Sequence, residues 1–372
     1  MRIAKVEIAN LWGKELIEIP FKHRVSFLTG SNGSGKSTIL NIIHDVLNQQ
    51  VVNDYHLVTT KNTNWAASIF YNDNFCKSLV NLCVSDEKGF MDFFEKEIIN
   101  NHKNLPINAA ELWGLISSYY SKCDKDKDNS YQAKQTYVFN ANSSLVKNKT
   151  NCLGFCGFAF EKNKAEDEVK LNENEPLNDE RQNNTAFIFQ EDRIYDRKNL
   201  KSKLSDLSDW NDFYISMDSR YESLVDDVRS FELKYSRRGT QQNDAEQKLS
   251  EFDDVISKLN SYFEVEGKSI YWDDEQKITL KRNSDSEYTP WYMLSRGEKT
   301  IIYLFLSVFL YKDKVSVFLL DEPEISLHVR WQHTLIKDLS EIAPRSSFIV
   351  ATHSPSLVQK GWHSHCLDIS KL

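Results

Sequence analysis

The sequence predicts an α/β fold with a mostly parallel core sheet, an added antiparallel β lobe and an inserted helical hairpin. An apolar run, Val25-Ser26-Phe27-Leu28, leads into a glycine-rich turn and then into a helical pattern. Near the other end, the unbroken apolar run Val315–Leu320 lacks the alternation of a half-exposed strand, which indicates burial on both faces of a parallel sheet. Helical spacing of apolar residues among charges predicts the hairpin within residues 198–263.

The glycine-rich turn has the form GxxxxGK[ST], which cradles a nucleoside triphosphate. Its candidate nucleotide-binding residues are Gly30, Ser31, Asn32, Gly33, Ser34, Gly35, Lys36, Ser37 and Thr38. The glycines let backbone N–H groups turn inward around the β-phosphate, and the following helix directs the positive end of its dipole at the same anion. We expect Lys36 to lie between the β- and γ-phosphates and Ser37 to ligate Mg²⁺. Taken alone, the turn could also be an ordinary glycine turn before a helix.

The composition indicates a globular protein rather than a disordered or fibrous one, since 40% of the 372 residues are hydrophobic and 27% are charged. The formal net charge of −8 gives no support for a broadly basic surface that binds nucleic acid. No apolar run reaches the ~18 residues that a membrane-spanning helix needs, and the N-terminus has the pattern of an edge strand rather than a signal peptide. The six cysteines favour reduced thiols and a cytoplasmic location.

Two small groups of potential metal ligands stand outside the phosphate-binding pattern. Cys152 and Cys156 have no nearby second pair of ligands, and His363, His365 and Cys366 lack the CxxC spacing of a zinc site. Structural or incidental roles are therefore favoured for both groups.

The first predicted domain, residues 1–197, combines part of the core with the β lobe. Alternation predicts strands at 3–8 and 16–19 with a turn at Trp12-Gly13-Lys14, and a helix follows at 36–50. Aromatic and β-branched segments predict further strands at 65–71, 135–139, 153–160 and 185–189. Helical patterns are predicted at 90–100 and 109–120, and polar loops at 122–130 and 161–184.

The second predicted domain, residues 198–263, is the helical hairpin, with Gly239 in its turn. Arms of roughly 20–30 residues would extend about 30–45 Å, which is too short for a long coiled-coil arm. The basic cluster Lys234, Arg237 and Arg238 at the tip could contact nucleic acid or an acidic partner, although a solvated turn is the commoner reason for such a cluster. Residues 264–372 form the third predicted segment and begin with a strand pair.

The C-terminal third supplies a second group of candidate residues. Leu294-Ser295-Arg296-Gly297-Glu298-Lys299 precedes an apolar helix, and a serine hydroxyl with glycine amides at a helix start can hold an anion. Alone, such a hexapeptide would usually be an ordinary cap. Asp321 and Glu322 follow the buried strand, at the end where ligands bind in open α/β sheets. We expect Asp321 to hold Mg²⁺ and Glu322 to align and deprotonate the attacking water.

Two further strand ends carry candidates. The predicted buried strand 346–352 delivers His353, whose imidazole would hydrogen-bond the γ-phosphate. Gln190 ends the strand at 185–189 and could reach the Mg²⁺ and the attacking water, although a polar strand-to-helix turn is the alternative. A lone histidine is more often structural. The order of the motifs, with the phosphate loop first, then LSRGE, the Asp-Glu strand and the Thr-His strand, nevertheless predicts an ATP-binding site.

These motifs resemble those of ABC-type ATPases of the SMC/RecF/OLD branch, and most of all the stand-alone AAA-family ATPases of bacterial anti-phage systems such as PARIS and Septu. The resemblance is carried by the phosphate loop, by Asp321-Glu322-Pro323-Glu324-Ile325-Ser326-Leu327-His328 and by Thr352-His353-Ser354-Pro355. It is strong over about residues 1–50 and 290–360 and loose between them. The fold that it implies is a P-loop NTPase with an ABC-type head.

The resemblance also implies that ATP is shared between two subunits. Ser295, Gly297 and Glu298 would belong to the signature motif, which contacts the γ-phosphate of ATP held by a second subunit. Residues 324–327 would lie at the subunit interface, and Gln190 would be the Q-loop residue. Val329 replaces a proline that is more frequent in the family, and Arg296 replaces the transporter-type glycine, which weighs against a transporter. ATP would then favour a closed assembly, and hydrolysis of the ATP would allow the assembly to open.

The function implied is a sensor or switch subunit of an anti-phage defence system, working as a homo-oligomer (a dimer or a larger ring). It would respond to a phage-derived trigger and control a separate effector, a nuclease or toxin, because only nineteen residues follow His353. The alternative is a RecF/SMC-like DNA-repair or DNA-binding ATPase, against which the net charge and the missing long coiled coil argue mildly. A transporter subunit would need a docking surface for membrane partners, and the sequence shows none.

Overall fold

The computed structural model describes residues 2–48, 65–71, 76–83, 93, 108–123, 134–137, 157–160, 186–190, 224–235, 242–272, 278–282, 284, 288–359 and 361–372. The chain divides into two compact units, Met1–Ala186 with Leu367–Leu372, and Phe187–Cys366. Several predicted features lie outside the described residues, among them the hairpin turn at Gly239, the basic residues Arg237 and Arg238, and the pair Cys152 and Cys156.

The first unit contains an antiparallel sheet in the order β2-β1-β4-β5-β6, with β7 also paired to β5. Its strands are β1 (Ile3–Ala9), β2 (Leu16–Pro20), β4 (Trp65–Tyr71), β5 (Cys76–Cys83), β6 (Lys134–Tyr137) and β7 (Gly157–Phe160). Exposed and buried residues alternate along β2, as expected for an edge strand with one solvated face. The helix α4 (Ala109–Cys123) packs against β1 and β4, and this sheet confirms the predicted antiparallel lobe.

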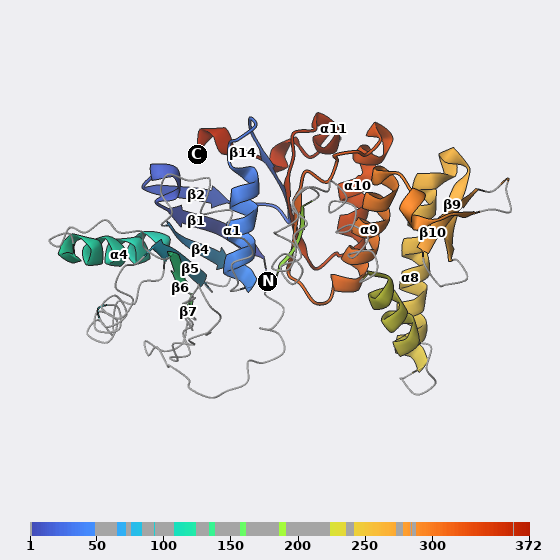
Figure 1. Cartoon of the computed structure of the whole chain (residues 1–372), viewed down its shortest axis with the longest axis horizontal. Helices are drawn as coiled ribbons and strands as arrows, with labels where there is room; N and C mark the ends of the chain where they lie inside the picture. The colour runs from blue at the N-terminus through green and yellow to red at the C-terminus, as the bar shows by residue number, and fades with distance from the viewer. Residues whose placement is uncertain are drawn as a thin grey trace, which may run out of the picture. The chain divides into compact units, whose positions relative to one another are not determined.

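The glycine turn lies between β3 (Val25–Thr29) and α1 (Lys36–Asn48) of the same unit. The first four residues of β3 are buried, and α1 packs against β4 and β5 (Figure 1). The buried residues of α1 include Ile39, Ile43 and Val46. Asn48 fixes the end of α1, because its side chain exchanges hydrogen bonds of 2.9 and 2.8 Å with the backbone of Ala186. The predicted strand–turn–helix order is confirmed.

The second unit contains the strands β13 (Ser347–Ala351), β12 (Val317–Asp321) and β8 (Ala186–Gln190) as neighbours in that order. The strands β12 and β13 are parallel, with Leu319 opposite Ile349 and Asp321 opposite Ala351. Every residue of both strands is buried, which agrees with the absence of alternation in their sequences. The helices α9 (Arg296–Tyr311), α10 (Val329–Ile342) and α11 (Pro355–Val358) belong to this unit and pack in sequence, α9 on α10 and α10 on α11.

Two helices represent the predicted hairpin, one at 224–235 and the other α8 (Gln242–Phe263). They pack together with α9 through three aromatic rings. The ring centroid of Phe231 lies 5.7 Å from that of Phe252 and 5.1 Å from that of Phe309. Beside α8, β9 (Lys268–Trp272), β10 (Ile278–Arg282) and β11 (Tyr288–Thr289) form a small antiparallel sheet (Figure 1). Among the residues that the structure describes, no helix is long and apolar enough to cross a membrane.

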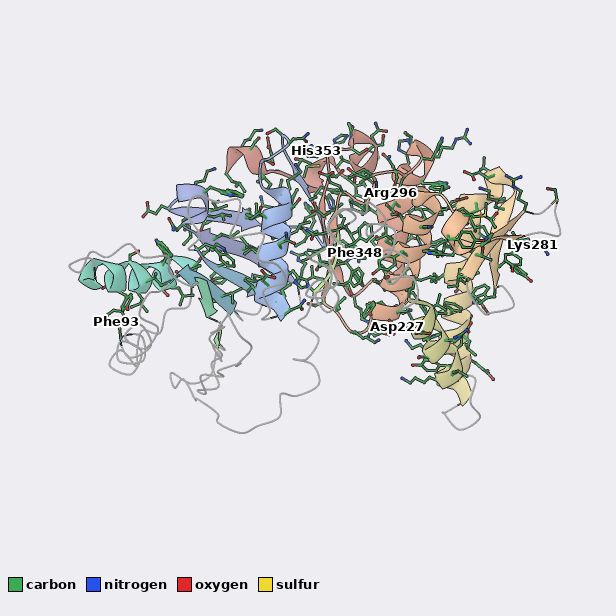
Figure 2. The ribbon with its side chains drawn as sticks, viewed as in Figure 1. Phe93, Asp227, Lys281, Arg296, Phe348 and His353 are labelled. Carbon is green, nitrogen blue, oxygen red and sulfur yellow. The ribbon has the colours of Figure 1, made fainter. Side chains whose placement is uncertain are left out.

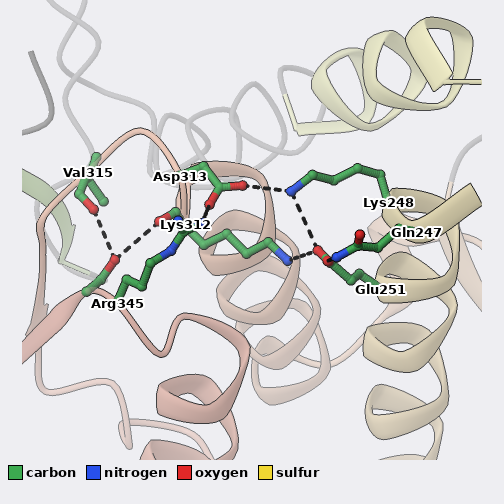
Figure 3. A network of polar contacts seen from close by, with 8 residues as sticks. Gln247, Lys248, Glu251, Lys312, Asp313, Val315 and Arg345 are labelled. Atoms are coloured by element: carbon green, nitrogen blue, oxygen red, sulfur yellow. Dashed lines mark hydrogen bonds and ion pairs between the residues drawn. The ribbon is translucent and has the colours of Figure 1, made fainter. Parts of the chain in front are cut away.

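A network of charged side chains joins α8 to the C-terminal end of α9 (Figure 3). Lys312 donates to Glu251 at 2.6 Å, while Asp313 accepts from Lys248 at 3.0 Å and from Arg345 at 2.5 Å. These residues line a cavity of about 400 Å³. Because each of these charges faces an opposite one, the network attaches the hairpin to the core of the second unit.

Candidate phosphate loop and strand-end carboxylates

The glycine turn has a backbone that side chains would not tolerate. Gly30, Gly33 and Gly35 have φ angles of 145°, 76° and 93°, a region that favours glycine. Lys36 is only 4% exposed, and its Nζ donates to the carbonyl oxygens of Gly30 at 3.3 Å and Ser31 at 3.2 Å. The lysine is therefore held against the turn, and all the predicted phosphate-loop residues lie together in the first unit.

Trp12 lies directly over this turn, which the sequence did not predict. A Cβ atom added to Gly35 would lie 1.8 Å from Cη2 of Trp12, so glycine is needed there for space as well as for its φ angle. Trp12 itself has φ of 53° and is 37% exposed, although bulky residues rarely adopt this conformation. With Ser31, Ser34 and Ile39 it lines a cavity of about 220 Å³ beside the turn. Strain of this kind is concentrated at ligand sites.

In the second unit, the ends of β8 and β12 bring an amide and a carboxylate together. The Gln190 Nε2 atom donates to Oδ2 of Asp321 at 3.1 Å, and the two side chains are 6% and 9% exposed. Buried polar groups normally satisfy each other in this way. The oxygen atoms of this pair are the type of ligand that Mg²⁺ prefers.

The next carboxylate faces an imidazole. Nε2 of His353 lies 3.6 Å from Oε1 of Glu322, and both side chains are 33% exposed. Glu322 has φ of 47°, and its N–H donates to the Ala351 carbonyl at 2.8 Å, which joins the end of β12 to the end of β13. The residues Gln190, Asp321, Glu322 and His353 thus lie at the ends of three neighbouring strands.

The segment Ser295–Glu298 begins α9 and forms a capping box. The Ser295 N–H donates to Glu298 Oε2 at 2.7 Å, and the Glu298 N–H donates to Ser295 Oγ at 3.3 Å. Lys268 Nζ donates to the other oxygen of Glu298 at 2.6 Å. Burial opposes ionisation, but the hydrogen bonds from Lys268 and Ser295 prevail and hold the pKa of Glu298 below its ordinary value.

The glycine of this segment is required by packing. A Cβ atom on Gly297 would lie 2.6 Å from the carbonyl oxygen of Ser326, so the start of α9 contacts the segment after the strand-end carboxylates. Ser295 and Arg296 are exposed at the start of the helix, and Figure 2 labels Arg296 there.

Each unit carries residues of a kind that binding of a nucleoside triphosphate with Mg²⁺ needs. In the first unit the glycine turn offers a cradle that a Cβ atom would fill, Lys36 a buried ammonium and Ser37 a hydroxyl. In the second unit Asp321 and Gln190 offer side-chain oxygen atoms. In the described part of the chain, no group of three or more His, Cys, Asp or Glu side chains could hold a metal ion by itself.

The strand–glycine turn–helix unit and the carboxylates at the ends of buried strands define a P-loop ATPase. The chain belongs to the AAA_15 family, the AAA ATPase domain, whose model matches residues 1–358.

The relatives of the chain include two probable ATPases of retrons and an endonuclease. It is 23% identical over 410 residues to the "Retron Ec83 probable ATPase" of Escherichia coli, covering 96% of this chain and 69% of that protein. It is 21% identical over 377 residues to the "Retron Vc95 probable ATPase" of Vibrio cholerae serotype O1 biovar El Tor, covering 89% and 66%. A stretch of 81 residues is 38% identical to "Endonuclease GajA" of Bacillus cereus (strain VD045), covering 21% and 14%. The chain thus spans about two thirds of the retron ATPases and a small part of GajA.

Among solved structures, the chain is similar to the SMC head domain from Thermotoga maritima. The sequence identity is 14% and the TM-score is 0.39, with 96% of this chain and 92% of the other covered.

Proposed function

We propose that this chain binds ATP with Mg²⁺ and hydrolyses it to ADP and phosphate, and that the hydrolysis controls an assembly of the chain with itself. The observation that carries the proposal is the group at the strand ends of the second unit, where Gln190 contacts Asp321 at 3.1 Å and Glu322 lies 3.6 Å from His353. A carboxylate for the metal, a second for the water and an imidazole for the phosphate are the groups that this hydrolysis needs.

In the proposed reaction, Lys36 and the amides of the glycine turn hold the β- and γ-phosphates. Glu322 accepts a proton from a water molecule while the oxygen of that water attacks the γ-phosphorus. The bond between the γ-phosphorus and the oxygen that bridges it to the β-phosphate breaks, which releases ADP and phosphate. His353 hydrogen-bonds the γ-phosphate. Ser37, Asp321 and Gln190 would hold Mg²⁺, which would neutralise charge on the phosphate oxygens. We further propose that Trp12 stacks on the base, since its ring lies over the turn.

We propose that each ATP is shared by two copies of the chain, with Ser295 and Gly297 of one copy contacting the γ-phosphate held by the other. Large apolar side chains next to the two segments concerned support this. Tyr292 and Met293, which precede Ser295, are 72% and 66% exposed, and Val329, which follows residues 324–328, is 52% exposed. Exposed apolar groups of this size suit a surface that a partner covers. Two poor half-sites would become one good site, so ATP would favour the closed assembly.

The proposed biological role is a switch in defence against phage, with a separate nuclease or toxin as the effector and a phage-derived trigger. The similarity to the retron ATPases and to Endonuclease GajA supports this role. The proposed location is the cytoplasm.

The test begins with release of phosphate from ATP by the purified chain and by its Lys36→Ala variant. We expect hydrolysis by the unchanged chain and none by the variant, because the ammonium that binds the phosphates is lost. Equal rates would contradict the proposal. Native mass measurement with and without ATP then gives the number of copies. A gel shift with double-stranded DNA, with and without ATP, separates a switch from a DNA-repair ATPase, for which ATP-dependent DNA binding is expected.

A further inference from the structure

Glu324 is a buried carboxylate that binds the backbone around His353. It is 8% exposed, and its Oε1 accepts from the N–H groups of His353 and Ser354, each at 3.2 Å, and from the Thr352 hydroxyl. The three donors belong to consecutive residues that follow β13. One oxygen atom therefore holds in place the loop that carries the predicted phosphate-sensing imidazole.

The other contacts of residues 324–328 extend this connection. Gln332 Nε2 donates to the Leu327 carbonyl at 2.9 Å, and Gln332 Oε1 accepts from the Ser354 hydroxyl at 2.7 Å, so one side chain of α10 joins the same two segments. At the other side, Gly297 at the start of α9 approaches the Ser326 carbonyl so closely that a Cβ atom would lie 2.6 Å from it. A continuous set of contacts thus runs from the start of α9, through residues 324–328, to His353.

Fold stability alone gives little reason for a carboxylate at this position. Its second oxygen, Oε2, is buried and has no hydrogen-bond partner among the residues that the structure describes. Burial is the main influence on the carboxyl and raises its pKa, while the hydrogen bonds from Thr352 and the backbone amides act in the opposite direction. Buried polar groups that are only partly satisfied destabilise a fold, and where they occur they need another explanation.

The backbone on both sides of Glu324 is strained as well. Glu322 has φ of 47° and Ser326 has φ of 68°, in a region that residues other than glycine rarely adopt. Strained non-glycine residues are concentrated at active sites and switch regions. The strain and the half-satisfied carboxylate coincide within five residues that join the predicted general base to the predicted subunit contact.

We propose that Glu324 is a positioning residue that couples residues 324–328 to His353, so that contact made by a partner copy at this segment sets the position of the imidazole. The inference rests on the proposed function and adds the path by which assembly acts on hydrolysis. Glu324 does not touch the phosphates in this account. It acts through the amides of His353 and Ser354, which move with its carboxylate.

The test compares Glu324→Ala with Glu324→Gln. Alanine removes the acceptor of the His353 amide and of the Thr352 hydroxyl, and it leaves the Ser354 amide with the Thr352 hydroxyl oxygen alone. A catalytic group misplaced by about 1 Å can lose about 100-fold in rate. We expect kcat for ATP hydrolysis to fall about 10- to 100-fold, with KM for ATP within about threefold, because Lys36 and the glycine turn still bind the nucleotide. Glutamine keeps the accepting oxygen, so we expect it to restore kcat to within about threefold of the unchanged chain.

A second readout separates coupling from a purely structural effect. If two copies share a site, turnover per chain rises with protein concentration as the assembly forms. This rise should persist in Glu324→Gln and be lost in Glu324→Ala. The matched control is Asp338→Ala on α10. Asp338 accepts a hydrogen bond from Tyr262 at 2.6 Å and lies 3.1 Å from the Lys258 ammonium, both on α8, and neither contact involves residues 324–328 or 352–354. The kcat of this variant should stay within about twofold of the unchanged chain.

The inference is overturned if Glu324→Ala keeps the kcat of the unchanged chain, or if Asp338→Ala loses as much. If Glu324→Ala does not fold, Thr352→Val decides, because it keeps the shape of the side chain but removes one donor to Oε1 and one of the two acceptors of the Ser354 amide. We expect a loss of about 3- to 10-fold in kcat, since the two hydrogen bonds of this hydroxyl are lost while both backbone amides still donate to Oε1, and an unchanged kcat overturns the inference. Failure of the unchanged chain to hydrolyse ATP would instead contradict the proposed function.

Discussion

Replacing Gly35 by alanine tests how the phosphate turn is built. Two separate costs are expected from the structure. The φ angle of 93° disfavours any side chain, and the new Cβ atom would lie 1.8 Å from Cη2 of Trp12, so the indole would have to move away from the turn. If the indole stacks on the base, as proposed, its displacement removes that contact from the nucleotide.

The two costs can be separated by a matched variant. Gly33 has φ of 76°, but nothing lies within 4 Å of its added Cβ atom, so Gly33→Ala carries the backbone cost alone. With about 2 kcal/mol for the strained backbone and about 2 kcal/mol for a lost base–aromatic contact, binding should weaken about 30-fold in Gly33→Ala and about 1,000-fold in Gly35→Ala. Trp12→Ala alone should weaken binding about 30-fold.

Calorimetry with a non-hydrolysable ATP analogue provides the dissociation constants. In the double variant of Trp12 and Gly35, binding should be no weaker than in Gly35→Ala, since the stacking contact is already lost. Equal affinities for Gly33→Ala and Gly35→Ala would refute this account of Trp12. So would a Trp12→Ala variant that binds as tightly as the unchanged chain.

Three further predictions concern the second unit. Glu322→Gln should keep ATP binding, lose at least about 100-fold in hydrolysis and accumulate the closed assembly on native mass measurement, and hydrolysis at the unchanged rate would rule out Glu322 as the base. The pKa of Glu298 is held below 4.5 in the folded chain, so its contribution to stability is complete above the pKa of the unfolded chain and is lost as the pH falls through the folded pKa. Lys268→Met should raise the folded pKa of Glu298, so this loss of stability should occur at higher pH. Urea unfolding between pH 7 and 3 measures it, and an unshifted dependence of the free energy of unfolding on pH would contradict the assignment. Asp313→Ala should lower the free energy of unfolding by about 1 kcal/mol or less, because its ion pairs are partly exposed, and a loss above about 2 kcal/mol would show that the network contributes more than its exposure suggests.

Local patterns were sufficient to predict most of the described strands and helices. The unbroken apolar residues of β12 and β13 predicted their burial, and the glycine spacing predicted the turn between β3 and α1. Such patterns succeed because burial on one or both faces imposes a period on the sequence itself. The pairing of Gln190 with Asp321 could be anticipated because both end strands of one sheet.

Other features could not be predicted because they depend on contacts between distant residues. Trp12 seemed to be a turn residue only, since nothing local places its ring over Gly35. Glu324 stands among charged and polar residues and has the sequence pattern of an exposed loop, but it is 8% exposed and faces the loop at 352–354. The charge network of Figure 3 joins α8 to Lys312 and Asp313, which lie more than sixty positions further along the chain, so no short pattern identifies it.

The sharing of ATP between two copies can be measured by mixing two inactive variants. Lys36→Ala has no functional phosphate turn but keeps Ser295, whereas Ser295→Arg keeps the turn but blocks the start of α9. Neither should hydrolyse ATP alone. In a 1:1 mixture, half of the dimers contain one of each, and each of these has one complete site out of two, so we expect up to about a quarter of the activity of the unchanged chain. A mixture no more active than its separate components would contradict it.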